Sequence, residues 1–293
     1  MSKTSKEMID AVSSAYYGKF FALEDTFSTP VPSIIYHYTN VSSLISIIEN
    51  KTLWASRAEY LNDASEFQYG LNICRGELKK LANVGAEYEK FVDRINVGMS
   101  STSNSPFVAC FCQSGDLLSQ WRGYSAHGQG LSIGFHSKPL SELDRVRLEN
   151  VIYDRRAQVD FHWQHVKLLA DAFITTDADL DDEAVLGELV GYTGALERAS
   201  AIMKDSAFQE ENETRIFVSD WSVKPADIRF RSRNNLIVPY IEVPLAKVWS
   251  GAIEEVIVGP GPDPDVRVSN IKHFLEIKGL GNIAVKASKC QLR

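Results

Sequence analysis

The stretch that decides how this chain folds is Ile34-Ile35-Tyr36-His37-Tyr38-Thr39. β-Branched and aromatic side chains fill most of its positions, and such side chains suit a pleated, half-buried strand. The proline-rich Thr29-Pro30-Val31-Pro32 ends the segment before it, so we expect the folded core to begin here. Because alternate side chains of a strand share a face, Ile35, His37 and Thr39 should point the same way. The stretch therefore predicts a strand that delivers polar groups to a functional cleft.

Length and composition are those of an ordinary globular protein: 293 residues, 44% hydrophobic and 24% charged. The formal charge of -7 gives no general attraction to nucleic acid or to an anionic membrane, although a local basic patch is compatible with it. No apolar run reaches the roughly 18–20 residues of a membrane helix, and the N-terminal residues lack the pattern of a signal peptide. We expect a cytoplasmic protein that makes no membrane contact.

Neither the cysteines nor the histidines are spaced like metal ligands. Cys110 and Cys112 are separated by one residue, which is tighter than a zinc knuckle, and no Cys/His partner pair follows. His162 and His165 can share a helix face but have no third ligand nearby. We expect reduced thiols and no metal site.

Strand and helix patterns are interspersed along the chain without strict alternation, which favours a mixed α+β fold. Further strands are expected at residues 53–55, 107–111, 129–135, 211–218, 228–230, 236–243, 255–258 and 283–285. Helices are expected at residues 41–48, from a capping box at Asp63 to about Leu81, and at 266–277. Residues 1–30 form an amphipathic helical segment with a linker, and 31–293 a single domain with an acidic helical insertion at about 156–205.

One candidate site lies in the strand expected at residues 211–218. Strand alternation places Glu211, Glu213 and Arg215 on one face. Two adjacent carboxylates raise each other's pKa, and they suit hydrogen bonds to sugar hydroxyls or stabilisation of a developing cation. The alternative is a solvated edge strand in which Arg215 offsets the two acids.

A second candidate site is the segment Asp116-Leu117-Leu118-Ser119-Gln120-Trp121-Arg122-Gly123-Tyr124. Aromatic, guanidinium and acidic side chains beside glycines are typical of a wall that stacks a planar ring and contacts phosphates. The alternative is a capped helical turn, with Asp116 as the N-cap and Trp121 packed into the core.

Several motifs, taken in order, resemble one mostly bacterial family of unknown function that is grouped with the ADP-ribosyltransferase-like folds. They are Tyr36-His37-Tyr38-Thr39, Leu61-Asn62-Asp63 with Glu66-Phe67, Phe111-Cys112 with Asp116 and Ser119-Gln120-Trp121-Arg122-Gly123-Tyr124, Ile133-Gly134-Phe135, Phe208 with Glu211-Asn212-Glu213-Thr214-Arg215, and Val258-Gly259-Pro260. The resemblance covers about residues 34–289. It implies a split β-sheet core with flanking helices around a cleft for NAD, which is the substrate.

The resemblance also implies roles for single residues. His37 looks like the first-strand residue of the NAD site, with Tyr38 and Thr39 beside it. Glu213 or Glu211 looks like the catalytic acid, and the choice between them stays open.

Three residues of the second candidate site look like further NAD contacts. Tyr124 resembles the ring that stacks on nicotinamide, and Trp121 lies in the same motif. Arg122 is expected to pair with the pyrophosphate.

The implied activity is transfer of ADP-ribose from NAD to a macromolecular acceptor, either protein or nucleic acid. Such transferases often act as toxins or phage-defence effectors, which implies a possible antitoxin or immunity partner. One alternative is a catalytically silent nucleotide-sensing or partner-binding module. Another is a metal-dependent nuclease or phosphoesterase with Asp116, Glu211 and Glu213 as ligands.

Overall fold

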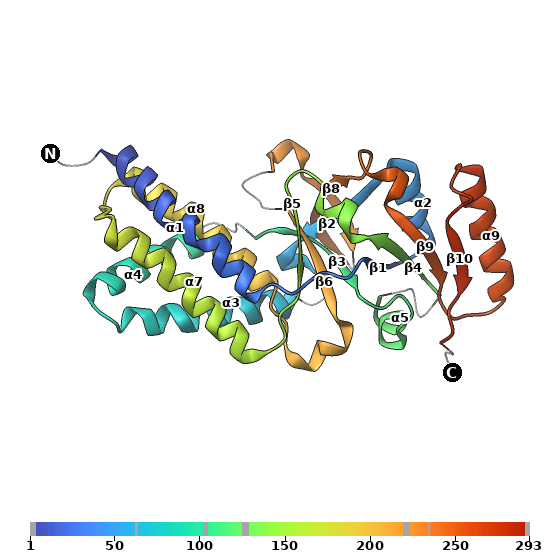
Figure 1. Cartoon of the computed structure of the whole chain (residues 1–293), viewed down its shortest axis with the longest axis horizontal. Helices are drawn as coiled ribbons and strands as arrows, with labels where there is room; N and C mark the ends of the chain where they lie inside the picture. Colours follow the sequence, from blue (N-terminus) through green and yellow to red (C-terminus); the bar gives the residue numbers. More distant parts are fainter. Residues whose placement is uncertain are drawn as a thin grey trace.

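The computed structural model describes residues 4–61, 64–101, 105–124, 129–218, 223–233 and 235–290. Figure 1 shows a lobe of helices on one side and a sheet with covering helices on the other. The helical lobe consists of α1 (Ser5–Phe27), α3 (Ala64–Ala82), α4 (Ala86–Ser101), α7 (Arg155–Thr175) and α8 (Glu183–Ala201). The protein is thus an α+β protein, as the sequence predicted.

The helical lobe draws its helices from three separate parts of the chain. α1 opens with a capping box between Thr4 and Glu7, and its apolar stripe is fully buried against α7 and α8. The N-terminal segment therefore packs into the same lobe as the helical section expected at residues 156–205. α4 was not expected from the sequence.

Ten strands form one mixed sheet within the described residues. They are β1 (Ile34–Thr39), β2 (Thr52–Arg57), β3 (Phe107–Cys112), β4 (Leu131–His136), β5 (Val146–Asn150), β6 (Glu213–Val218), β7 (Arg229–Arg233), β8 (Leu236–Pro244), β9 (Ile253–Val258) and β10 (Ala284–Ala287). The order is β10-β9-β4-β1-β3-β2-β8-β7, with β6 paired to β3 and β5 to β6. Only the β9–β10 pair is parallel among these strands.

The main core lies beneath this sheet. α2 (Val41–Asn50) contributes Leu44, Ile47 and Ile48 to it, and α9 (Pro264–Ile277) contributes Ile271 and Leu275. In Figure 1, α9 closes the β10 end of the sheet. These two helices were expected from their helical spacing.

The sheet opens at β3, and this opening positions the candidate site. One edge of β3 pairs with β6 along its whole length. On the other edge, β1 pairs only at Cys112, and β2 only at Phe107 and Val108. Between these two contacts, at residues 109–111, no described strand pairs with this edge of β3.

The expected strands and helices recur with small shifts, and two differences bear on the site. The strand expected from Glu211 begins at Glu213, because residues Ser206–Glu211 form a 3-10 turn (η3) and Asn212 has a left-handed φ of 40°. The short strand β5 was not expected. The capping box expected at Asp63 lies outside the described residues. Among the described helices, none combines the length and the apolar character needed to cross a membrane.

Candidate functional site

A cavity of about 320 Å³ lies where β1 and β2 separate over β3. Its floor is formed by Ala109, Cys110 and Phe111 of β3. His37 and Thr39 of β1 line one side. The strand predicted to deliver polar groups to a cleft does so at this opening.

His37 bridges the gap that β1 leaves beside β3. Its Nδ1 lies 3.0 Å from the backbone oxygen of Cys110, which β1 itself does not reach. A carbonyl can only accept, so Nδ1 carries the proton and Nε2 is the acceptor nitrogen. Burial lowers the pKa of His37, and nearby Arg231 lowers it further, against the opposing effect of the Cys110 hydrogen bond. The ring is therefore neutral at pH 7.

The first wall of the cavity, here named the acidic wall, gathers charged side chains from both lobes. Its members are Glu66 of α3, Lys204 after α8, Glu211 at the end of η3, and Glu213 and Arg215 of β6. Lys204 Nζ lies 2.8 Å from Glu66, 2.6 Å from Glu211 and 3.4 Å from Glu213. Arg215 Nη2 lies 2.9 Å from Glu66.

Both carboxylate oxygens of Glu213 already accept hydrogen bonds from neighbouring side chains. Arg215 donates to it twice, from Nε to Oε1 at 2.8 Å and from Nη2 to Oε2 at 2.8 Å. The Cys110 thiol and Lys204 also contact it. Burial by itself raises the pKa of Glu213, but Arg215 and Lys204 outweigh burial and lower it to about 2. Glu213 is therefore a fixed anion that holds the wall together.

Glu211 has a different environment. Its Oε2 accepts from Lys204, and 14% of its side-chain surface stays exposed. Burial raises the pKa of Glu211, and the neighbouring Glu213 and Glu66 add to this, while Lys204 opposes it. The mutual effect expected of the two carboxylates is thus present at Glu211, whereas at Glu213 it is overridden.

The second wall, here named the arginine wall, comes from the β2–β8–β7 part of the sheet. It consists of Trp54 and Ser56 of β2 and Arg231 and Arg233 of β7, which line the cavity, with Tyr240 of β8 packed against the Trp54 ring. The Arg231 guanidinium lies 5.6 Å from the Trp54 ring and 6.0 Å from the Tyr240 ring, within cation-π range. Its Nη2 donates to Ser56 Oγ at 2.9 Å.

Arg231 keeps unused hydrogen-bonding capacity. Within the described part of the chain, its buried Nε has no hydrogen-bond partner. Burial lowers the pKa of Arg231, and the like charge of Arg233 lowers it further. Arg233 donates to the backbone oxygens of Tyr60 and Leu61. A buried guanidinium donor beside a second positive charge favours an anionic ligand.

Two residues expected at the site lie elsewhere. Trp121 has no exposed surface; it packs edge-on against Tyr38 and donates to Asp116 Oδ1 at 2.8 Å. A fully buried ring cannot stack on a ligand, so the alternative of a core tryptophan describes it. Arg122 is exposed on α5 (Leu118–Tyr124) and does not line the cavity.

The remaining expected residues are only partly placed. Tyr38 touches the cavity, but its hydroxyl donates to Ser114 O and accepts from Leu117 N, so it anchors the start of α5. The side chain of Tyr124 lies outside the described part of the chain. Asp116 is bound to Ser288 and to Lys289 N near the C-terminus.

The ligands required by a metal-dependent nuclease do not converge. Asp116 is absent from the cavity lined by Glu211 and Glu213, and the described residues contain no group of three His, Cys, Asp or Glu able to hold a metal ion. His162 and His165 lie in the core of the helical lobe, where His165 Nε2 is 2.6 Å from the Tyr16 hydroxyl.

Sequence reasoning did not assign a site role to most of the residues that line the cavity, among them the charged residues Glu66, Lys204, Arg231 and Arg233. The alternation of Arg231 and Arg233 on a strand was available as a signal, since both must share a face. Glu66 stood in a motif of the resemblance but was given no role, and Lys204 carried no signal. Both come from distant helical segments and reach the wall only through tertiary packing.

Comparison with known proteins gives one partial match. Residues 120–216 match the model of a family described as a protein of unknown function (DUF2971). No curated protein and no solved structure matches the chain. The matched region contains Lys204, Glu211, Glu213 and Arg215 of the acidic wall, but neither His37 nor the arginine wall.

Proposed function

We propose that the cavity binds NAD and that the protein transfers ADP-ribose from it to a macromolecular acceptor. The observation that carries this proposal is the opening of the sheet between β1 and β2, with His37 on one side and carboxylates from the β6 region on the other. Such an arrangement is what the proposed ADP-ribosyltransferase-like split sheet requires. A role as a toxin or phage-defence effector with an antitoxin partner belongs to the same proposal and rests on the resemblance alone.

The size and charge of the cavity suit part of the dinucleotide. A volume of about 320 Å³ accommodates a group of the size of nicotinamide and its ribose, and the pyrophosphate would lie next to them at Arg231, which lines the cavity. The pyrophosphate would then pair with Arg231, whose Nε has no partner among the described residues. Arg231 takes the role that the sequence had suggested for Arg122.

Cleavage of the bond between ribose C1′ and nicotinamide passes through a cation-like state, as in glycoside hydrolysis. The bonding electrons leave with neutral nicotinamide, and an acceptor oxygen or nitrogen forms the new bond to C1′. Negative charge beside the ribose stabilises this state. The acidic wall has three carboxylates against two cations, so its formal charge favours the reaction.

The two glutamates take distinct roles in this proposal. Glu213 already accepts from Arg215 through both oxygens, so binding a ribose hydroxyl would break contacts that it already makes. Glu211 is partly exposed and has a raised pKa, which suits a group that contacts substrate and receives the acceptor's proton. We therefore assign catalysis to Glu211 and positioning to Glu213. Nε2 of His37 would accept from a ribose hydroxyl.

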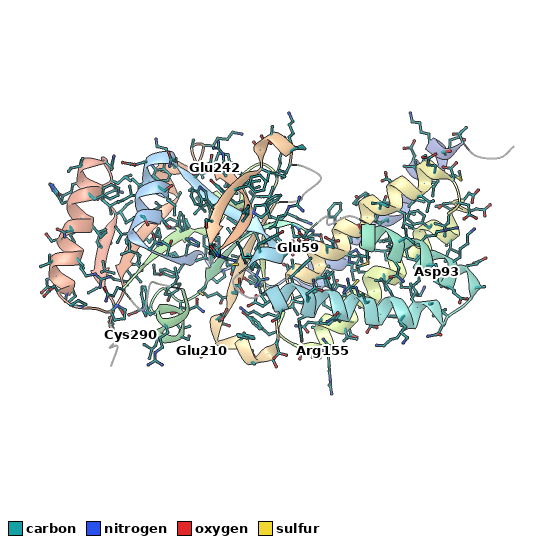
Figure 2. The ribbon with its side chains drawn as sticks, turned by 180° about the vertical axis from the view of Figure 1, so that it is seen from behind. Glu59, Asp93, Arg155, Glu210, Glu242 and Cys290 are labelled. Carbon is teal, nitrogen blue, oxygen red and sulfur yellow. The ribbon has the colours of Figure 1, made fainter. Side chains whose placement is uncertain are left out.

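The decisive experiment is incubation of the purified protein with labelled NAD and cell lysate, followed by measurement of nicotinamide release and of label transfer. Glu211→Gln should reduce the rate roughly 10²–10³-fold, as loss of a preorganised electrostatic contact does. The matched control is Glu210→Gln, because Glu210 is the preceding residue and is exposed at the surface (Figure 2). Wild-type protein that neither consumes NAD nor transfers label would exclude the transferase.

A second candidate is a nucleotide-sensing module without catalysis. The saturation of Glu213 and the ion pair between Glu211 and Lys204 favour it, since both carboxylates already have partners. In that case NAD raises the melting temperature while nicotinamide release stays at background. The same samples therefore separate the two candidates.

A further inference from the structure

One face of the sheet remains open beyond the cavity. Paired residues of neighbouring strands share a face, and the register pairs Trp54 with Glu242, and Arg229 with Tyr240. Arg231 and Arg233 follow Arg229 at alternate positions and so lie on this face too. We name this surface the wing face, defined by Trp54, Tyr240, Arg229, Arg231 and Arg233.

The wing face is continuous with the cavity and reaches solvent. Trp54, Arg231 and Arg233 also line the cavity, so the surface leads directly into it. Trp54 is 37% exposed, and the Arg229 side chain is 60% exposed. β7 ends the strand order, so nothing in the sheet covers its outer edge among the described residues.

The main core takes the opposite face of these strands. The opposite face of β2 and β8 supplies Leu53, Ala55, Ile241 and Val243 to the main core. The wing face instead presents an indole ring and three guanidinium groups. An exposed surface of this composition is typical of ligand recognition.

The charge of the wing face is opposite to that of the whole chain. The chain carries -7, yet this face has three arginines and one carboxylate, Glu242, which lies 3.3 Å from Arg229 in an exposed pair. Exposed pairs of this kind contribute little, and salt screens them. The surface therefore complements a polyanion.

The spacing of these groups favours a single-stranded nucleic acid. Alternate residues of a strand lie about 7 Å apart, which approximates the distance between phosphates in an extended single strand. The exposed part of Trp54 offers an aromatic surface against which an unstacked base can pack. A paired duplex would leave no base free to reach either the indole or the cavity.

We propose that the wing face binds single-stranded nucleic acid and that a nucleotide of this strand is the acceptor at the cavity. The second part rests on the proposed transferase function, in which Arg231 pairs with the pyrophosphate of NAD, so in that complex Arg229, Arg233 and Trp54 hold the strand. There, a nitrogen or oxygen of the bound nucleotide bonds to ribose C1′, nicotinamide departs with the electrons of the broken bond, and the acceptor's proton passes to Glu211.

Binding is tested without NAD, by fluorescence anisotropy of a labelled single-stranded oligonucleotide of about a dozen nucleotides, as DNA and as RNA. The affinity should fall with salt, with a log–log slope of about −2 for three phosphate contacts. Arg229→Gln with Arg233→Gln should weaken binding at least tenfold and bring the slope close to −0.7. Trp54→Ala should weaken binding roughly tenfold or more with little change in slope.

The matched control is Arg156→Gln, an exposed arginine on α7 in the helical lobe, which should bind as wild type does. Equal affinity of the wild type and the double arginine variant would overturn the assignment of this face. Binding of polyglutamate in place of the oligonucleotide would overturn it in favour of an acidic protein partner.

The acceptor part is tested by adding labelled NAD to the protein with the oligonucleotide. Label should enter the oligonucleotide, and the single variant Arg229→Gln should reduce both this transfer and the nicotinamide release that accompanies it, while Arg156→Gln should change neither. Release of nicotinamide without label in the oligonucleotide would overturn the acceptor class alone. Absence of any release would overturn the transferase proposal, and the anisotropy result would still decide the binding surface.

Discussion

Both walls of the cavity contain cationic side chains, but these side chains have different partners in the two walls. In the acidic wall, Lys204 contacts three carboxylates, and Arg215 contacts two. In the arginine wall, Arg231 has one hydroxyl partner and two aromatic neighbours, and its Nε has no partner among the described residues. The first wall is satisfied internally, whereas the second retains capacity for a ligand.

This difference follows from where the residues originate. The acidic wall joins α3 and the segment after α8 to β6, so it connects the helical lobe with the sheet. The arginine wall lies within the sheet alone, at its β7 edge. We infer that the acidic wall holds the two lobes in place, and that the arginine wall holds substrate.

The largest expected effect comes from breaking the acidic wall. Arg215→Leu leaves Glu213 and Glu66 buried with one cation fewer, and loss of one partner from a buried charge network typically costs about 3–5 kcal/mol. Urea unfolding of the variant and the wild type measures this. Arg231→Leu is the matched change in the other wall and should cost about 1–2 kcal/mol, for one hydrogen bond and two cation-π contacts. Equal costs for the two variants would remove the distinction between the walls.

The sequence predicted the elements whose periodicity is strong. β1, β4, α2 and α9 show clear alternation or helical spacing, and they appear where expected. β5 is short, although Val146 and Leu148 alternate with charged residues, and α4 buries Phe91, Val92 and Ile95 on one face, so both carried a pattern that sequence reasoning missed. The elements missed from the sequence were therefore amphipathic segments that no capping signal singled out.

The site was predictable only in part, for a physical reason. His37, Glu211 and Glu213 were found because each lies in a local pattern, although the strand alternation assumed for Glu211 fails at Asn212. Glu66 and Lys204 contribute through contacts between segments far apart in the chain. Such contacts depend on how the lobes pack, which no local pattern encodes.

A smaller effect should appear when the acidic wall is titrated. The pKa of Glu213 is about 2 in the folded protein, below the ordinary value of 4.5. Its stabilisation is therefore fully present above pH 4.5 and is lost as the pH falls towards 2, by roughly 2–3 kcal/mol. Glu211, whose pKa is raised, offsets part of this in the wild type.

Unfolding measured from pH 6 to pH 3 checks this expectation. Glu213→Gln removes the titrating group, so it should be less stable than the wild type at pH 6, and the difference should narrow as the pH falls. If the stability difference between Glu213→Gln and the wild type were constant across this range, Glu213 would not be held ionised. The carboxylates of the acidic wall would then not be satisfied by Lys204 and Arg215.

The smallest expected effect concerns the arginine wall. Inorganic pyrophosphate at 10–100 times its dissociation constant should stabilise the wild type by about 1–3 kcal/mol, because it binds only the folded state. Thermal unfolding with and without pyrophosphate measures the shift. Arg231→Gln should lose most of it, while Arg156→Gln, in the helical lobe, should keep it. A shift that survives Arg231→Gln would place the anion elsewhere, and the contrast between the two walls would then lose its functional meaning.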